Sequence, residues 1–296
     1  MRLTFLFFAV LALLFCALLL LRLRDWRMDR AEWLRLAAQQ PADPLRFHPA
    51  MVADLPESAQ RFFKFAIAPG TPLLSVAEID MGGQFSLGTG DAPNYRPMQA
   101  QQILAGPHGF VWRMRLPGWV PVSGSDAGSE SGSWTRFRIL GFIPVARMGN
   151  GTDHVRSAYG RCVAEAVFWT PAALLPGPGV TWEGVGRDTA RVTVAIGALS
   201  QAVDVALNAA GQPITVGFMR WTDANPGKQY RLQPFGGMLS DFREVRGYRL
   251  PFRVEAGNMF GTDEQFIFYK AEVIDIRFRS GRTSNEWARW WYQPDP

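Results

Sequence analysis

The sequence predicts a mainly β protein, in which one large curved antiparallel sheet closes over a central α-helix and a transmembrane helix lies at the N-terminus. Three observations lead to this prediction. One long amphipathic helix is predicted at residues 152–169, segments of alternating hydropathy lie on both sides of it, and residues 3–21 carry no charge. No strand–helix–strand rhythm repeats along the chain, which argues against a parallel α/β enzyme fold.

The central helix is predicted from the spacing of its apolar residues. Thr152 or Asp153 can cap its N-terminus, and Pro171 should end it near Trp169. The apolar side chains fall on one stripe of the helix, over which the sheet is expected to close. They are Val155, Ala158, Tyr159, Cys162, Val163, Ala166 and Val167.

About ten strands are predicted from segments in which apolar and polar residues alternate, the pattern of a strand with one buried face. The short turns between them predict an antiparallel meander. These segments lie near residues 79–87, 98–104, 110–116, 134–143, 190–196, 203–207, 214–218, 230–235, 241–245, 249–256 and 265–278.

Two glycine-containing features interrupt this pattern. Residues 123–133 (SGSDAGSESGS) have the composition of a flexible linker and are expected to form a long hairpin loop. The pairs Gly82-Gly83 and Gly236-Gly237 lack the spacing of a phosphate-binding loop, so we expect bulges or strand turns there.

Residues 3–21 predict a membrane span. As a helix they would be about 28 Å long, close to the bilayer core of about 30 Å. No small-x-small cleavage site precedes Arg22, so we favour an uncleaved anchor over a signal peptide. Trp26 and Trp33 are expected in the interfacial belt beyond the core.

Four segments are predicted in chain order. Residues 1–24 form the transmembrane anchor, and residues 25–48 form a juxtamembrane helix and linker. A second short helix at 56–65 then opens the antiparallel β domain of residues 49–280. An aromatic tail follows at residues 281–296.

Composition argues against several classes of function. The net charge of +5 comes from arginines spread through strands at alternate positions, so no nucleic-acid surface is predicted. Cys16 and Cys162 do not form a disulfide framework or a thiolate site. The three histidines, His48, His108 and His154, show no metal-ligand spacing, and no metal or cofactor is predicted. Asp153, His154 and Ser157 are interpreted as a solvated helix start and not as a catalytic triad.

A candidate ligand site is predicted where the helix stripe faces the strand aromatics. If the helix covers a curved sheet incompletely, these side chains should border a cleft for a lipid or another apolar molecule. The alternative is that they interdigitate in a filled core. The predicted binding residues are Phe110, Trp112, Tyr159, Val163, Val167 and Trp169.

Glu165 is the polar residue of most interest, because it lies at the edge of the stripe and four residues after Arg161. One interpretation is a surface Arg161–Glu165 pair worth about 0.3 kcal/mol. The other is a carboxylate under the sheet that pairs with a strand arginine such as Arg220 or Arg138. Structural pairing is expected in either form, and no catalytic residue is predicted.

Four runs of the sequence stand out: GFIPVA at 141–146, the 165–176 block EAVFWTPAALLP, PFGG at 234–237 and GYRLP at 247–251. Together they resemble an uncharacterised bacterial family, a domain of unknown function, over roughly residues 50–280. The resemblance carries no activity with it. The meander also resembles, more distantly, the half-barrel of the LolA/LolB lipoprotein carriers, which implies an apolar cavity for acyl chains.

The side of the membrane on which the β domain lies is predicted in two opposite ways. Arg22, Arg24, Arg27 and Arg30 follow the span and only Arg2 precedes it, so positive-inside counting predicts a cytoplasmic domain. The LolA/LolB likeness and the common use of a lone anchor to tether an exported β domain predict the extracytoplasmic side, which we prefer.

The function expected from the sequence is a membrane-anchored, non-enzymatic protein that binds or carries an apolar, lipid-like molecule in the cell envelope. The alternative is an envelope structural or interaction module. A hydrolase is less favoured, because no convergent set of titratable residues is visible.

Overall fold

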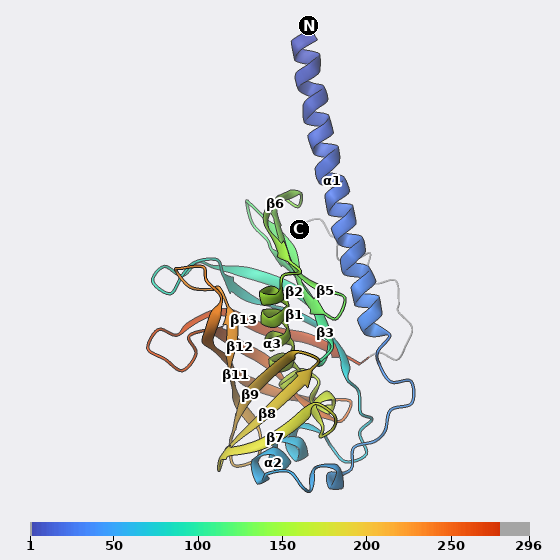
Figure 1. Ribbon diagram of the computed structural model, residues 1–296, viewed down its shortest axis with the longest axis vertical. Helices are drawn as coiled ribbons and strands as arrows, with labels where there is room; N and C mark the ends of the chain where they lie inside the picture. Colours follow the sequence, from blue (N-terminus) through green and yellow to red (C-terminus); the bar gives the residue numbers. More distant parts are fainter. Residues whose placement is uncertain (1, 279–296) are drawn as a thin grey trace.

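The computed structural model describes residues 2–278, and the predicted aromatic tail at 281–296 lies outside the described residues. It contains one sheet of 13 strands with three α-helices and two short 3₁₀ helices (Figure 1). The helices are α1 (Arg2–Ala37), η1 (Pro49–Val52), α2 (Glu57–Ala66), α3 (Thr152–Trp169) and η2 (Pro171–Leu174). The strands are β1 (Val76–Ser86), β2 (Tyr95–Ala105), β3 (Gly109–Leu116), β4 (Val122–Ser129), β5 (Gly132–Ile139), β6 (Ile143–Gly149), β7 (Val180–Gly186), β8 (Thr189–Ile196), β9 (Leu199–Leu207), β10 (Pro213–Thr222), β11 (Arg231–Val245), β12 (Tyr248–Asn258) and β13 (Phe266–Arg277).

The sheet is an antiparallel meander in two halves. Strands β1 to β6 form one half and β7 to β13 the other, and the halves join where β1 pairs with β13. Strands β6 and β7 are therefore the two edges. Helix α3 connects these edges across the concave face, where it contacts strands of both halves. The predicted mainly β fold, a curved antiparallel sheet closed over a central helix, is confirmed.

The curved sheet is covered on both faces. On the concave face, the predicted apolar stripe of α3 packs in the main core, with Cys162, Val163 and Val167 almost fully buried. On the convex face, Trp33 and Leu36 of α1 pack on alternate residues of β2 and β3, among them Ile103 and Val111. Residues along a strand alternate between these two environments because successive side chains point to opposite faces.

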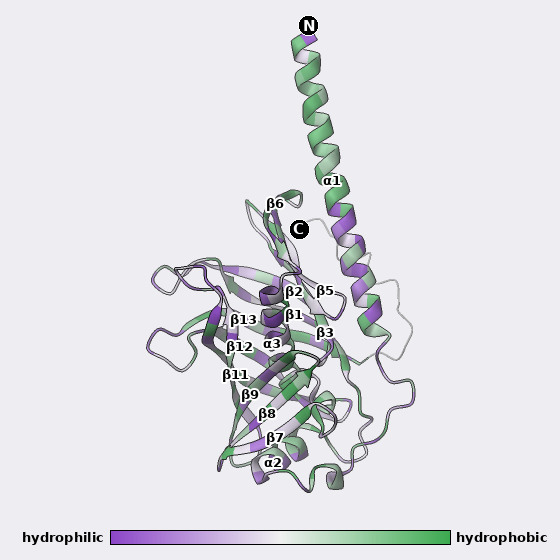
Figure 2. Ribbon diagram, viewed as in Figure 1, coloured by the Kyte–Doolittle hydropathy of each residue, from purple (hydrophilic) through white to green (hydrophobic). Residues whose placement is uncertain are grey.

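Helix α1 is continuous from the apolar residues near the N-terminus into the polar segment that docks on the sheet (Figure 2). Within residues 2–278, α1 alone is long and apolar enough to cross a membrane, by length and composition. The prediction of an interfacial position is wrong for Trp33, because this side chain is buried against the sheet and its Nε1 donates to Glu78 at 3.0 Å.

The prediction of a loop at residues 123–133 is also wrong. Most of this segment forms β4, which pairs with β3 and β5 along its whole length. Small residues are needed there because both faces of β4 are covered by helices. A Cβ on Gly128 would lie 2.4 Å from the Cβ of Ala158 on α3. On the other face, Ser125 donates to Asp29 of α1 at 3.0 Å.

The remaining differences concern strands and caps. The edge strands β6 and β7 were not predicted, because both expose most of their residues and lack a clear buried face. Gly236 and Gly237 lie inside the single long strand β11, which the sequence pattern divided in two. Gly151 is the N-cap of α3, in place of the predicted Thr152 or Asp153, and no side chain caps the helix.

Candidate functional site

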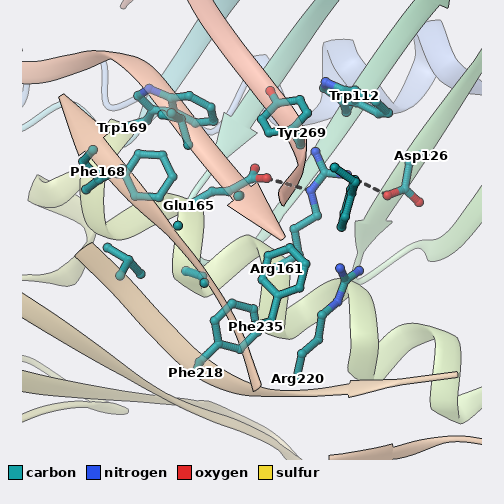
Figure 3. A pocket seen from close by; sticks show the side chains of 18 of the residues that line it. Trp112, Asp126, Arg161, Glu165, Phe168, Trp169, Phe218, Arg220, Phe235 and Tyr269 are labelled. Atoms are coloured by element: carbon teal, nitrogen blue, oxygen red, sulfur yellow. Dashed lines mark hydrogen bonds and ion pairs between the residues drawn. The ribbon is translucent and has the colours of Figure 1, made fainter. Parts of the chain in front are cut away.

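A cavity lies between α3 and the concave face of the sheet (Figure 3). Its volume of about 280 Å³ is near the lower end of the roughly 300–1,000 Å³ that is usual for small-molecule sites. Aromatic and aliphatic side chains form most of its wall. The lining consists of Phe85, Trp112, Asp126, Thr135, Phe137, Arg161, Ala164, Glu165, Phe168, Trp169, Val216, Phe218, Arg220, Phe235, Gly236, Gly237, Leu239, Val254, Ala256, Phe268 and Tyr269.

Helix α3 contributes a second stripe to this cavity, beside the apolar stripe that packs in the core. Arg161, Ala164, Glu165 and Phe168 recur at spacings of three and four, which places them on one face of the helix. This face carries two charged residues, so apolar periodicity did not identify it. The cavity therefore opens at the flank of the predicted stripe.

The structure divides the six predicted binding residues into two groups. Trp112 and Trp169 line the cavity. The other four are not among the lining residues and pack in the main core. These four are Phe110, Tyr159, Val163 and Val167.

Part of the cavity wall is formed by residues without large side chains. Gly237 of β11 pairs with Val216 of β10 on one side and with Ala256 of β12 on the other, and all three line the cavity. A Cβ on Gly237 would lie 3.0 Å from the Cβ of Ala256. These small side chains leave space between the aromatic walls.

Arg161 holds the polar wall of the cavity together (Figure 3). Its Nε donates to Glu165 Oε1 at 2.7 Å, and its Nη1 donates to Asp126 Oδ2 at 2.7 Å. Gln102 donates to the second oxygen of Glu165. The guanidinium also lies over the ring of Phe110, 4.5 Å from its centroid. Arg161 thus contacts both carboxylates of the cavity wall.

This polar network continues from Asp126 to the start of α3. The Thr135 hydroxyl donates to Asp126 at 2.7 Å, so its oxygen accepts from His154 Nε2 at 3.0 Å, and His154 Nδ1 accepts from Ser133. Burial lowers the pKa of His154 below its usual value. The interpretation of His154 as part of a solvated helix start is therefore wrong. Asp126 was missed because it lies in the segment that was predicted as a loop.

Arg220 is arranged differently from Arg161. Its guanidinium stacks on the ring of Phe235 at 4.9 Å, and its buried Nε has no hydrogen-bond partner among the described residues. Burial, followed by repulsion from Arg161, lowers the pKa of Arg220. Within residues 2–278 it forms no ion pair with Glu165. Arg138, the other hypothesised partner of Glu165, lies on the opposite face of the sheet and pairs with Asp25.

Asp126, Arg161 and Glu165 are held in structural contacts in the cavity wall. Burial raises the pKa of Tyr269 and the pKa of the nearby Cys162 thiol, so both side chains are kept neutral. Among residues 2–278, no group of three or more histidine, cysteine, aspartate or glutamate side chains is placed to hold a metal ion.

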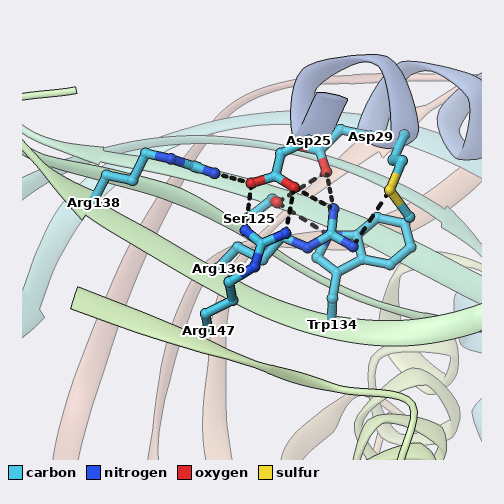
Figure 4. A network of polar contacts seen from close by, with 8 residues as sticks. Asp25, Asp29, Ser125, Trp134, Arg136, Arg138 and Arg147 are labelled. Atoms are coloured by element: carbon cyan, nitrogen blue, oxygen red, sulfur yellow. Dashed lines mark hydrogen bonds and ion pairs between the residues drawn. The ribbon is translucent and has the colours of Figure 1, made fainter. Parts of the chain in front are cut away.

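A second polar cluster joins α1 to the convex face of the sheet (Figure 4). Asp25 accepts two hydrogen bonds from Arg147, at 2.6 and 2.8 Å, and a third from Arg138. Arg136 lies 3.4 Å from Asp25 and 4.0 Å from Asp29. We call Asp25, Asp29, Arg136, Arg138 and Arg147 the outer ion cluster. It joins residues more than a hundred positions apart, so no local spacing predicted it.

Comparisons with known proteins place this chain in a family. No curated protein matches the sequence. A LolA superfamily protein from Nitrosomonas europaea is similar in structure, with a TM-score of 0.43 and 10% identity over 75% of this chain and 92% of that chain. A domain described as an outer membrane lipoprotein-sorting protein, from Vibrio parahaemolyticus, has a TM-score of 0.40 and 11% identity over 73% and 91%. Residues 45–271 match the family of unknown function DUF6544, which confirms the family resemblance, and the chain belongs to this family.

Proposed function

We propose that this protein is a membrane-anchored, non-enzymatic binder or carrier of an amphiphile, whose apolar chain occupies the cavity and whose anionic head binds Arg220. The observation that carries this proposal is the cavity itself. It combines a wall of aromatic side chains with one guanidinium whose Nε has no hydrogen-bond partner among the described residues.

The apolar part of the ligand is inferred from the wall. Water held in a cavity needs two to four polar partners, and the side chains that face most of this cavity are rings and aliphatic groups. Phe168, Phe218 and Phe235 offer no polar side-chain atom to bound water. An acyl or other apolar chain would gain about 25 cal/mol for each Å² of apolar area removed from water.

The polar part of the ligand is inferred from the two arginines in the wall. Arg161 is already bound to Glu165 and Asp126, so its charge is balanced within the protein. Within residues 2–278, Arg220 forms no ion pair and stacks on the ring of Phe235. Burial and repulsion from Arg161 lower its pKa, although the nearby Asp126 and Glu165 act in the opposite direction. Guanidinium binds carboxylate and phosphate oxygens through paired hydrogen bonds. A carboxylate or phosphate head is therefore the chemistry that would complete this site.

A displacement assay tests both parts of the proposal. Anilinonaphthalene sulfonate, an apolar fluorophore with an anionic group, would be bound to the full chain in detergent and displaced by oleate or by oleyl alcohol. Oleate should displace it at lower concentration than the alcohol. Arg220→Gln should remove this difference, and Arg220→Lys should keep part of it. Equal displacement by the two compounds in the wild type would contradict an anionic head.

A cavity-filling variant tests where the amphiphile binds. Ala164 lies on the cavity face of α3 with 5% of its surface exposed, so Ala164→Phe should fill part of the space. The matched control is Ala195→Phe, at an exposed position of β8. Native mass spectrometry of detergent-extracted protein should show a lipid-sized adduct on the wild type and the control, and lose it with Ala164→Phe. Absence of an adduct from all three proteins would favour the envelope structural or interaction module.

The anchor and its orientation also belong to this proposal. Helix α1 would hold the cavity at the surface of the membrane from which an amphiphile is taken or to which it is delivered. We place the β domain on the extracytoplasmic side, against the count of arginines after the span. Reporter fusions at the C-terminus decide this, because alkaline phosphatase is active only after export. Inactive phosphatase with a fluorescent green fluorescent protein fusion would reverse the orientation.

A further inference from the structure

We infer that the turn between β5 and β6 enters the bilayer beside α1 and makes a second membrane contact. This inference rests on the part of the proposed function in which α1 spans the membrane. The observation that supports it most directly is an aromatic contact between this turn and α1. The ring of Phe142, in the turn, meets the ring of Phe15, in the apolar segment of α1, edge to face at 5.8 Å between centroids.

The contact with Phe15 fixes the depth of the turn. Phe15 lies six residues before Leu21, the last residue of the uncharged run. At a rise of about 1.5 Å per residue, it lies about 9 Å inside the end of the predicted span. Apolar segments that lie in the membrane interface commonly insert by about 5–10 Å. The turn beside Phe15 therefore reaches hydrocarbon whenever α1 crosses the membrane.

Two further contacts show that the hairpin runs along α1 from the polar segment toward the apolar one. Within its strands, Arg138 of β5 and Arg147 of β6 both bind Asp25. Near its turn, Arg22 lies 3.2 Å from the position that a Cβ on Gly141 would take. Asp25, Arg22 and Phe15 succeed one another toward the N-terminus of α1. Figure 1 shows the β5–β6 hairpin beside α1 at the corresponding level.

The composition of the hairpin changes at the level where the membrane boundary is expected. Residues 139–146 (ILGFIPVA) contain no charged or polar side chain, and Arg138 and Arg147 flank them. Several of these side chains are exposed, including Leu140 at 46% and Val145 at 56%. Scattered exposed apolar residues are common on soluble surfaces. Here they form one continuous run beside a helix segment of the same hydropathy (Figure 2).

The backbone of this turn is compatible with shallow insertion. Unpaired backbone groups are costly in hydrocarbon, and β6 is an edge strand. Two N–H groups of the turn are bonded, because Phe142 N donates to Ile139 O at 3.3 Å and Leu140 N donates to Pro121 O, just before β4, at 3.0 Å. Pro144 carries no N–H on the edge. These features favour insertion of the tip and not of the whole strand.

Depth-dependent quenching tests this inference on the full chain in vesicles of equimolar phosphatidylcholine and phosphatidylglycerol. Cys16→Ala removes the exposed cysteine, and Cys162 is buried. A nitrobenzoxadiazole fluorophore is then placed at Ile143→Cys or Val145→Cys. Val185→Cys is the matched control, because Val185 is an exposed valine of the opposite edge strand β7. Leu14→Cys reports on the span itself.

Lipids with a nitroxide on the acyl chain should quench the fluorophore at positions 143, 145 and 14 at least about twofold more than the fluorophore at position 185. If the fluorophore is quenched at position 14 but is quenched no more at positions 143 and 145 than at position 185, the contact of the hairpin with the bilayer is refuted. The span formed by α1 is then still supported. No quenching at 14 would show that α1 does not span the bilayer, and the hairpin inference would fail with it. Equal quenching by headgroup nitroxides at 143 and 185 would likewise exclude a bilayer contact of the turn.

Discussion

Replacing Asp25 by asparagine should release the polar half of α1 from the sheet. The Asp25 side chain is 3% exposed and is the shared acceptor of Arg138 and Arg147, with Arg136 at 3.4 Å. Asparagine has the same shape but no charge. The variant would therefore leave the guanidinium groups close together in a largely buried place, with Asp29 as the remaining carboxylate of the outer ion cluster.

The loss of stability expected for Asp25→Asn follows from the balance of charge in the outer ion cluster. Removing one partner of a buried ion pair typically costs about 3–5 kcal/mol, because the remaining charge stays desolvated. Arg138 already shows the effect, since burial and repulsion from Arg147 lower its pKa in the intact protein. Arg147 is 37% exposed and can turn toward water, which should moderate the loss. We expect Asp25→Asn to lower the free energy of unfolding by about 3 kcal/mol.

The assay is chemical denaturation of the full chain in detergent, followed by tryptophan fluorescence, with hydrogen exchange of α1 as a local readout. Asp241→Asn is the matched control, because Asp241 forms an exposed pair with Arg243 at 2.6 Å. Exposed pairs are screened by solvent and contribute little. Faster exchange should appear in residues 25–36 of Asp25→Asn and not in the control. Equal stability of the two variants, with unchanged exchange in α1, would refute the reasoning.

Three further outcomes are expected. Arg161→Met should lower the free energy of unfolding by about 3–5 kcal/mol by leaving two carboxylates unpaired, and adding Glu165→Gln should recover part of it in denaturant titrations. Gly128→Ala should cost about 1–3 kcal/mol, because its Cβ would lie 2.4 Å from an α3 side chain, whereas Gly217→Ala, with nothing within 4 Å, should be near neutral in thermal melts. Burial raises the pKa of Asp29 from 3.8 to about 6, so stability from its protonated form is present below pH 3.8 and lost as pH rises through about 6. Asp29→Asn should remove that decline when denaturation is measured across this range.

The sequence predicted those elements whose apolar residues recur at the spacing of a helix or a strand. The central helix ends at Trp169 as expected, because Pro171 prevents its continuation. Strands β2 and β3 were found from alternation because their apolar residues face a core. Strand β4 was missed because its glycine and serine residues are selected by helices on both faces, and the same composition is typical of a linker.

The candidate site was only partly accessible from the sequence. Trp112 and Trp169 were expected at a cleft and line the cavity. Phe168, Arg220 and Tyr269 line it too, but their convergence depends on how far β10 and β13 curve around α3. Asp126 could have been found only after β4 was recognised as a strand, because the alternation of β4 places it toward the helix.

The alternation of two neighbouring strands connects α1 to the cavity. On β5, Arg136 and Arg138 point outward to Asp25 of α1, whereas Thr135 and Phe137 point inward to the cavity. On β4, the same rule separates Ser125, which binds Asp29, from Asp126, which binds Arg161.

Because these residues are neighbours along the backbone, a shift of α1 against the convex face would move β4 and β5 and, with them, the Asp126–Arg161 contact. Slipping either strand by one residue would exchange its two faces. It would bring the arginines into the cavity and the aromatic wall toward α1. The docking of α1 and the shape of the cavity are therefore set by one register, and the outer ion cluster holds that register from the side of α1.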